Sequence, residues 1–177
     1  MQRMHKPVLA AVVSIIATLQ PLSSFEPKQD TSPPTNETSA ARPVPANSVV
    51  YTNKQYGFRI LLPKSWKGYS IIVSDWNGRI LDSNPEKDEK GPVISIRHPL
   101  WTKQNPRQDI PIMVFTLAQW QFIEKEDMAV SAAPIGPSEV GRNANHVFAL
   151  PARYNFAYLP GWQEVHDILQ HKALQAF

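Results

Sequence analysis

An alternation of apolar and polar positions marks the start of the folded part of this chain. Residues 58–62 read FRILL, and a period of two is typical of a strand with one face on a core. The preceding residues 53–57 are polar and end in a glycine, which favours a turn. Pro63 then removes the N–H donor that a continuing ladder needs. We therefore predict a turn over 53–57 followed by a strand over 58–62.

Further strands and two helices follow from the same kind of pattern. The Asn77-Gly78 dipeptide predicts a tight turn. The charged residues 82–90 predict a solvated loop. Residues 129–141, which include two prolines, predict a strand followed by a loop. Together the patterns predict a mainly antiparallel sheet with helices packed on it, either α+β or a sandwich. The predicted strands are 70–76, 93–97, 112–115 and 146–150, and the predicted helices are 117–127, capped by Thr116, and 161–170.

Residues 1–24 resemble a secretory signal peptide. Two basic residues precede an apolar run over 8–19, which is the order of a signal sequence and is shorter than the roughly 20 residues of a membrane-spanning helix. The cleavage site near Leu22-Ser23-Ser24 is poor, so an uncleaved N-terminal anchor is an alternative, and a buried helix of the domain is a third. We expect an exported protein, extracellular or in the cell envelope, whose only contact with a membrane is this segment.

Residues 25–48 are rich in proline, serine and threonine and carry one large apolar side chain, Phe25. Such a stretch buries too little surface to offset the entropy of ordering it. We therefore expect three parts: a signal peptide or anchor over 1–24, a disordered linker over 25–48 and a globular domain over 49–177.

Composition narrows the classes of function. The chain of 177 residues has no cysteine, which excludes disulfides, thiolate metal sites and a cysteine nucleophile. The net charge is only +3, and no run of basic residues is interleaved with aromatic ones, so we expect no nucleic-acid partner. His166 and His171 lie five positions apart and do not share a helix face. No metal site and no cofactor are expected.

The opening of the domain resembles a known family. The motif comprises Tyr51, Tyr56-Gly57-Phe58 and Leu62-Pro63-Lys64-Ser65-Trp66 and is similar to the start of PsbP-like domains, while segments 96–116 and 132–143 look like exported bacterial proteins that carry such a domain. The resemblance implies an α/β/α sandwich around a mainly antiparallel sheet. It also implies a protein that binds partners, because PsbP-like domains act mostly in that way.

The loop after residue 97 is the predicted binding surface. It places charged, aromatic and amide side chains between two strands, and loops held by a scaffold often carry binding residues. Trp and Arg are also enriched at interface hot spots. The alternative is that Arg107 and Asp109 pair with each other or with the backbone to brace the loop while Trp101 packs down. The candidate partner-binding residues are Arg97, His98, Trp101, Arg107, Gln108 and Asp109, with Lys103 beside them and Arg142 and Asn143 as a second contact.

These observations favour a non-enzymatic binding or assembly module whose partner is a protein or a cell-envelope component. A small hydrolase that uses His98 and Asp109 is an alternative, although Ser131 and Ser138 lie in no nucleophile motif. A third hypothesis is a carrier with an apolar pocket between sheet and helix.

Overall fold

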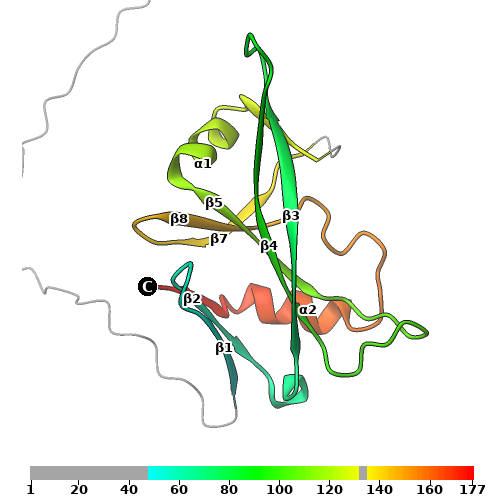
Figure 1. The fold of residues 1–177 in the computed structure, drawn as a ribbon. Coiled ribbons are helices and arrows are strands. Elements are labelled where there is room, and N and C mark those ends of the chain that lie inside the picture. Colours follow the sequence, from blue (N-terminus) through cyan, green and yellow to red (C-terminus); the bar gives the residue numbers. More distant parts are fainter. Residues whose placement is uncertain (1–47, 132–134) are drawn as a thin grey trace, which may run out of the picture. The chain divides into compact units, whose positions relative to one another are not determined.

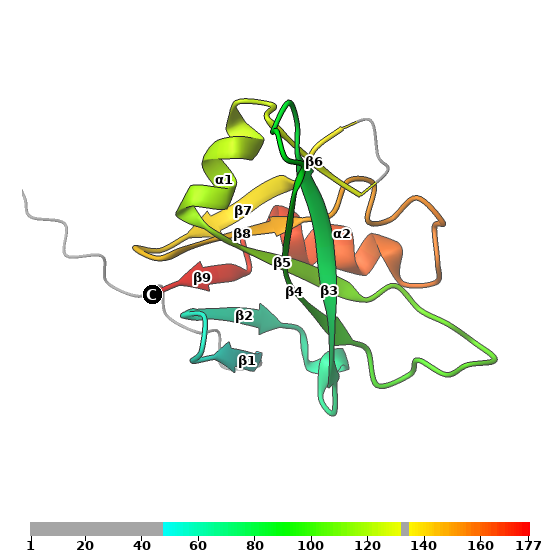
Figure 2. The same ribbon diagram turned by 45° about the horizontal axis from the view of Figure 1, so that its top comes forward.

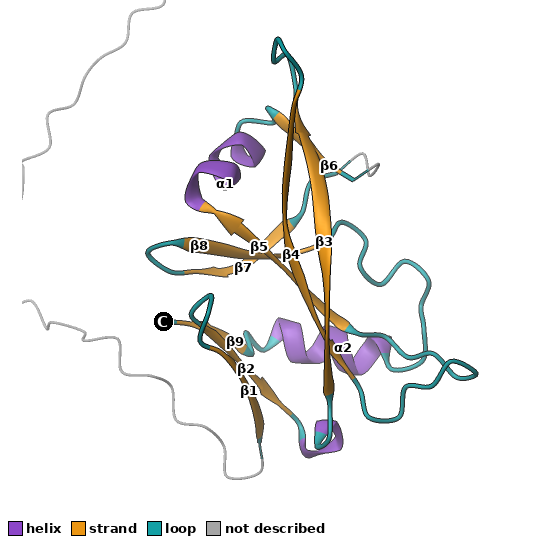
Figure 3. Cartoon of the chain, in the orientation of Figure 1, coloured by secondary structure: helices purple, strands orange, loops and turns teal. Residues whose placement is uncertain are grey.

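The computed structural model describes residues 48–131 and 135–177, so the predicted signal and linker segments lie outside the described residues, apart from Ser48. The described part contains two antiparallel sheets and two α-helices (Figures 1 and 3). The three-stranded sheet has the order β1 (Val49–Asn53), β2 (Phe58–Leu62) and β9 (Leu174–Ala176). The six-stranded sheet has the order β6 (Met128–Val130), β3 (Ser70–Ile80), β4 (Lys87–Arg97), β5 (Ile110–Thr116), β8 (His146–Leu150) and β7 (Ser138–Arg142).

The larger sheet curls. Its two edge strands, β6 and β7, are consecutive in the chain and are joined by only residues 131–137. Seven residues span at most roughly 25 Å when fully extended, so the two edges must approach each other. Figures 1 and 2 show the resulting half-barrel, with the long β3–β4 hairpin crossing the other strands.

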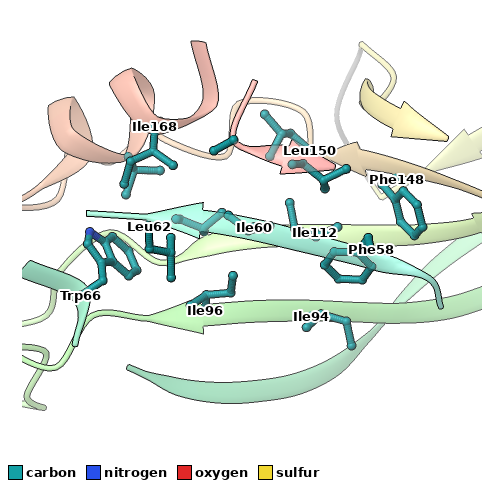
Figure 4. Packing of buried hydrophobic residues seen from close by; sticks show 14 of the residues in the cluster. Phe58, Ile60, Leu62, Trp66, Ile94, Ile96, Ile112, Phe148, Leu150 and Ile168 are labelled. Carbon is teal, nitrogen blue, oxygen red and sulfur yellow. The ribbon is translucent and has the colours of Figure 1, made fainter. Parts of the chain in front are cut away.

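Both faces of the six-stranded sheet are covered around β5, and each face has its own core there. On one face, side chains from β2, β4, β5, β8 and α2 (Trp162–Gln170) meet (Figure 4). On the other face, α1 (Leu117–Glu124) and β6 cover a second cluster that contains Trp76, Phe115 and Trp120. Ile110, Ile112, Met113, Val114 and Phe115 are all buried in consequence, and β5 is therefore almost uniformly apolar where a half-exposed strand would alternate.

Several local predictions are confirmed. The polar turn before β2 places Gly57 at φ 76°, and the Gly57 N–H bonds the carbonyl of Asn53. β2 and β8 have the predicted bounds. Thr116 caps α1 by accepting a hydrogen bond from the backbone of Gln119, whose side chain accepts one from the Thr116 N–H in return.

The predicted α/β/α sandwich is wrong. The two α-helices have eight and nine residues, and each covers one part of a sheet without forming a layer. The apolar surface that helices were expected to bury is covered by the second sheet and by the curl of the first. Residues 151–161 form a series of turns before α2 begins, which leaves little chain for a helical layer.

The predicted turn at Asn77-Gly78 is also wrong, because β3 continues through both residues to Ile80. Gly78 pairs with Glu89 on one side and Val130 on the other. A Cβ built on Gly78 would lie 2.9 Å from the carbonyl oxygen of Ala129, so the glycine allows a close approach of strands. The turn is displaced to residues 81–86, and β4 takes up part of the predicted charged loop.

Candidate binding surface

The predicted binding loop, residues 98–109, leaves β4 and returns to β5 across an ion pair. Arg97 Nη2 donates to Asp109 Oδ2 at 2.8 Å, and Arg97 Nε lies 3.2 Å from both carboxylate oxygens. The Arg97 guanidinium also lies 3.9 Å from the centre of the Trp101 ring, an arrangement that favours a cation–π interaction. These three residues close the neck of the loop, so their side chains are largely occupied with each other.

His98 is 4% exposed and lies beneath the loop. Its Nδ1 accepts the N–H of Leu100 at 3.1 Å, so in the neutral ring the proton is on Nε2. The ring stands edge-on to Trp66, with the ring centres 4.9 Å apart. Burial lowers the pKa of His98, the charge of Arg107 lowers it further, and Glu164 partly opposes both effects. The imidazole is therefore held neutral near pH 7.

His98 and Asp109 do not form the predicted pair of a base and its orienting acid. Both Asp109 oxygens accept hydrogen bonds from Arg97, and the His98 Nδ1 is taken by a backbone N–H. In the described part of the chain, His98 Nε2 has no hydrogen-bond partner, hydroxyl or other. The contacts of these two residues are those of a braced loop.

Gln108 and Arg107 join this loop to a second one, residues 151–161, between β8 and α2. The Gln108 N–H donates to the carbonyl of Pro160 at 3.0 Å, and its Nε2 donates to the carbonyls of Asp109 and Tyr154. Arg107 Nη2 lies 3.8 Å from a carboxylate oxygen of Glu164 at the start of α2. A direct pair between Arg107 and Asp109, one form of the alternative, is not observed, and each residue has a different ionic partner.

The second loop is a chain of tight turns that presents aromatic side chains. Backbone N–H groups of Tyr154, Phe156 and Tyr158 each bond the carbonyl three residues earlier. Arg153 and Tyr158 have positive φ, 53° and 47°, which is uncommon away from glycine and is often found at functional sites. Phe156 is 76% exposed and Tyr158 66% exposed.

The two loops lie next to each other on one side of the molecule in both Figures 1 and 2. Leu100, 66% exposed, adds a third large apolar side chain, and a cleft of about 350 Å³ runs between Leu100, Pro106 and Pro160. We call this the two-loop surface, defined by the exposed side chains of Leu100, Lys103, Pro106, Arg153, Phe156 and Tyr158.

Sequence reasoning missed the second loop. The signal lay in residues 154–162, YNFAYLPGW, where aromatic residues occupy alternate positions from 154 to 158 and a proline and a glycine follow. Conversely, most of the residues predicted as contacts support the loops from within. Of the predicted set on the first loop, Trp101 is half-buried against Arg97, while Gln108 is buried.

Arg142 and Asn143 are not brought together with the two loops, because the β7–β8 hairpin points to the opposite side in Figures 1 and 2. Arg142 pairs with Glu124 and Glu139, and hydrogen bonding to Arg142 lowers the pKa of the Glu139 carboxyl. Asn143 Nδ2 donates to the carbonyls of Tyr56, Gly57 and Phe177 at 2.9, 3.0 and 3.2 Å. The side chains of both residues are thus engaged in contacts within the protein.

Within residues 48–131 and 135–177, no three His, Asp or Glu side chains are placed to share a metal ion. Neither helix there has the length and apolar character needed to cross a bilayer. No protein-family model, curated protein or solved structure matches this chain. The PsbP-like resemblance therefore stays a prediction from the opening motif, and the sandwich that it implied is not the observed fold.

Proposed function

We propose that the protein is a non-enzymatic binding module, exported and acting outside the cytoplasmic membrane, that contacts a protein partner through the two-loop surface. The observation that supports this most directly is the exposure of Leu100, Phe156 and Tyr158 on two loops that are fixed to each other. Export is supported by the sequence of residues 1–24 alone.

The composition of the surface suits a protein partner. Exposed aromatic side chains bury large areas on association and carry a polar tip in tyrosine, which is why they are enriched at hot spots. Lys103 and Arg153 flank them and make no ion pair with any described residue. A partner with an apolar pocket and an acidic rim would match both features.

The bracing of the loops supports binding as well. Ordering a flexible loop costs about 0.5–1.5 kcal/mol for each immobilised side chain. Here the Arg97–Asp109 pair and the three Gln108 hydrogen bonds have fixed the loops before any partner arrives. The residues predicted as contacts, namely Arg97, His98, Gln108 and Asp109, would thus serve binding by positioning Leu100 and its neighbours.

The proposal is tested by site-specific cross-linking. A photo-reactive residue at position 100 should give a discrete cross-linked species in cells, whereas one at Leu81, an exposed apolar position in the turn after β3, should not. Phe156→Ser with Tyr158→Asn should abolish the species without lowering the melting temperature, because asparagine tolerates the positive φ at position 158. A species that persists in this double variant would contradict the proposal.

A hydrolase that uses His98 and Asp109 receives no support from the contacts of these residues. The two side chains are engaged by Leu100 and Arg97, respectively. The binding module is therefore the function that the geometry favours.

A further inference from the structure

The edge of β3 that faces away from β4 is open along most of its length. β3 has eleven residues, Ser70–Ile80, and all of them pair with β4. On the other side, β6 pairs only with residues 78–80 (Figure 3). Among the described strands, none pairs with residues 70–77 on that side. Most of a long strand is therefore a free sheet edge.

The backbone groups of this edge can be assigned from a bond near its β6 end. The carbonyl of Asn77 accepts the N–H of Ser131 at 3.2 Å, so Asn77 turns its backbone groups away from β4. In an antiparallel pair, residues that bond the neighbouring strand alternate with residues that do not. The residues that turn N–H and C=O outward, where no described residue bonds them, are therefore 71, 73 and 75.

The side chains of the open edge are apolar on both faces of the sheet. Residues 70–74 read Ser-Ile-Ile-Val-Ser. Ile72 and Val73 point to opposite faces, because successive residues of a strand alternate, and they are 39% and 64% exposed. A strand added to this edge would cover apolar surface on both faces at once.

Residues 70–76 lack the features that protect other sheet edges. Proteins commonly use short edge strands, prolines, lysines or bulges for this purpose. β1, β6 and β9 have five, three and three residues, and β7 has a register shift between Glu139 and Gly141. Residues 70–76 contain no proline or lysine, and their register with β4 has no shift. This edge is thus suited to pairing with another strand.

We infer that the open edge of β3 pairs with the same edge of a second copy of this chain, antiparallel and about a two-fold axis at Ile72. The order of polar and apolar residues in Ser-Ile-Ile-Val-Ser is the same in both directions, so an antiparallel copy is complementary to it. Ile72 then lies opposite its own counterpart. Ile71 lies opposite Val73, and both turn their backbone groups outward, so each such pair exchanges two hydrogen bonds.

The remaining side chains agree with this arrangement. Ser70 lies opposite Ser74, a pair whose hydroxyls can bond each other across the strands. Asp75 lies opposite residue 69, so the two carboxylates are roughly 20 Å apart along the strands. A parallel pair in register would set them directly opposite each other, which is unfavourable. This order of side chains favours a second copy over an unrelated strand, which would satisfy only the backbone groups.

Single cysteines in the full chain test the register, because the chain has no cysteine of its own. Under mild oxidation, Ile72→Cys should give a disulfide-linked dimer, since the Cα atoms of that pair would be about 4.5 Å apart. Val73→Cys should not, because its counterpart lies two residues further along, beyond the roughly 7 Å that a disulfide can span. Val73 is the more exposed of the two, so random collisions would give the opposite order. A mixture of Ile71→Cys and Val73→Cys should cross-link again.

Charged variants test the association itself, measured by analytical ultracentrifugation of the full chain. Ile72→Lys should weaken self-association by roughly tenfold or more, because it sets two ammonium groups opposite each other. A mixture of Ile72→Lys and Ile72→Glu should regain it, because the pair then has opposite charges. Leu81→Lys, at a 46% exposed apolar position in the turn after β3, should leave it unchanged.

Three results would overturn the inference. They are a wild-type chain that stays monomeric at its highest soluble concentration, equal cross-linking of Ile72→Cys and Val73→Cys, and a mixture of folded Ile72→Lys and Ile72→Glu that does not associate. Melting temperatures show whether the charged variants are folded, and the cysteine comparison decides if they are not. Residues 70–76 are not part of the two-loop surface, so failure here would leave the proposed function standing.

Discussion

At the scale of single residues, His98 is the most informative position. It is a histidine enclosed by protein, with the Trp66 ring set almost perpendicular to its own, Arg107 and Glu164 as the charged groups nearby, and a backbone N–H on Nδ1. Burial opposes its protonation, and Arg107 opposes it further. The surroundings therefore favour the neutral imidazole, and protonation of His98 destabilises the folded state.

His98 should make the fold less stable in mild acid. Its pKa in the folded protein is below the unfolded value of about 6.5, so the unfolded state binds the proton more readily. Its stabilising contribution is complete above pH 6.5 and is lost as the pH falls towards the folded pKa. Urea unfolding at pH 7 and pH 5 should show a loss of stability that is smaller in His98→Gln. If His98→Gln loses as much stability between pH 7 and pH 5 as the wild type, groups other than His98 cause that loss.

The sequence placed His98 on the correct loop but could not show its burial. The side chain points under the loop because Trp66, 32 positions earlier, and the start of α2 meet there, and such contacts depend on the whole fold. In the same way, the pattern identified Arg97 and Asp109 as polar residues on a loop. That they would bond each other depends on the register of β4 and β5, in which Ile96 lies opposite Ile110.

At the scale of elements, the neck of the 98–109 loop is the feature on which the two-loop surface depends. The side chains of Arg97 and Asp109 are only 25% and 20% exposed, and each is bonded by the other. Loss of one partner leaves a half-buried charge without its counter-charge.

Arg97→Ala should lower the free energy of unfolding by about 1–3 kcal/mol, because it removes charge-assisted hydrogen bonds and the packing on Trp101. Arg97→Lys should be almost as harmful, since an ammonium group cannot make the two-pronged contact. Chemical denaturation followed by tryptophan fluorescence measures both effects.

Arg79, which pairs with Asp88 and Glu86 on the exposed part of the β3–β4 hairpin, supplies the comparison. Arg79→Ala should cost clearly less stability than Arg97→Ala, because exposed ion pairs contribute little. Equal losses of unfolding free energy in Arg79→Ala and Arg97→Ala would contradict this prediction. They would mean that the Arg97–Asp109 pair contributes no more stability than an exposed ion pair.

Element types were predictable where the pattern was local. β2, β8 and the capped start of α1 follow from the apolar pattern, a proline stop and Thr116 as the N-cap residue. β9 has only three residues, LQA, and no pattern that short identifies a strand. β9 forms because the free edge of β2 supplies hydrogen-bond partners for it. The pairing joins residues 116 positions apart, such as Arg59 and Gln175.

At the scale of the whole molecule, one amide links the two sheets. Asn143 follows β7 in the larger sheet, and its Nδ2 reaches the turn between β1 and β2 and the last residue of the chain. Its Oδ1 accepts the N–H groups of Asn145 and His146. A single side chain thus fixes a hairpin, a turn and the C-terminus.

Asn143→Ala should destabilise the protein by about 1–3 kcal/mol, because it leaves several backbone groups without partners. Asn143→Asp should be worse, since a carboxylate cannot donate to the three carbonyls. Asn145→Ala removes an exposed amide two positions away and should be nearly neutral. Thermal unfolding of the three variants decides the matter, and similar melting temperatures would contradict the proposed link.

The placement of β9 bears on how the chain acquires its structure. The three-stranded sheet needs residues 174–176 to pair with β2, so it cannot be completed before those residues have been synthesised. Contacts that are so distant in sequence also close slowly. A chain that has not yet added residues 174–176 would therefore carry β2 with one unpaired edge, an exposed template for pairing with another strand.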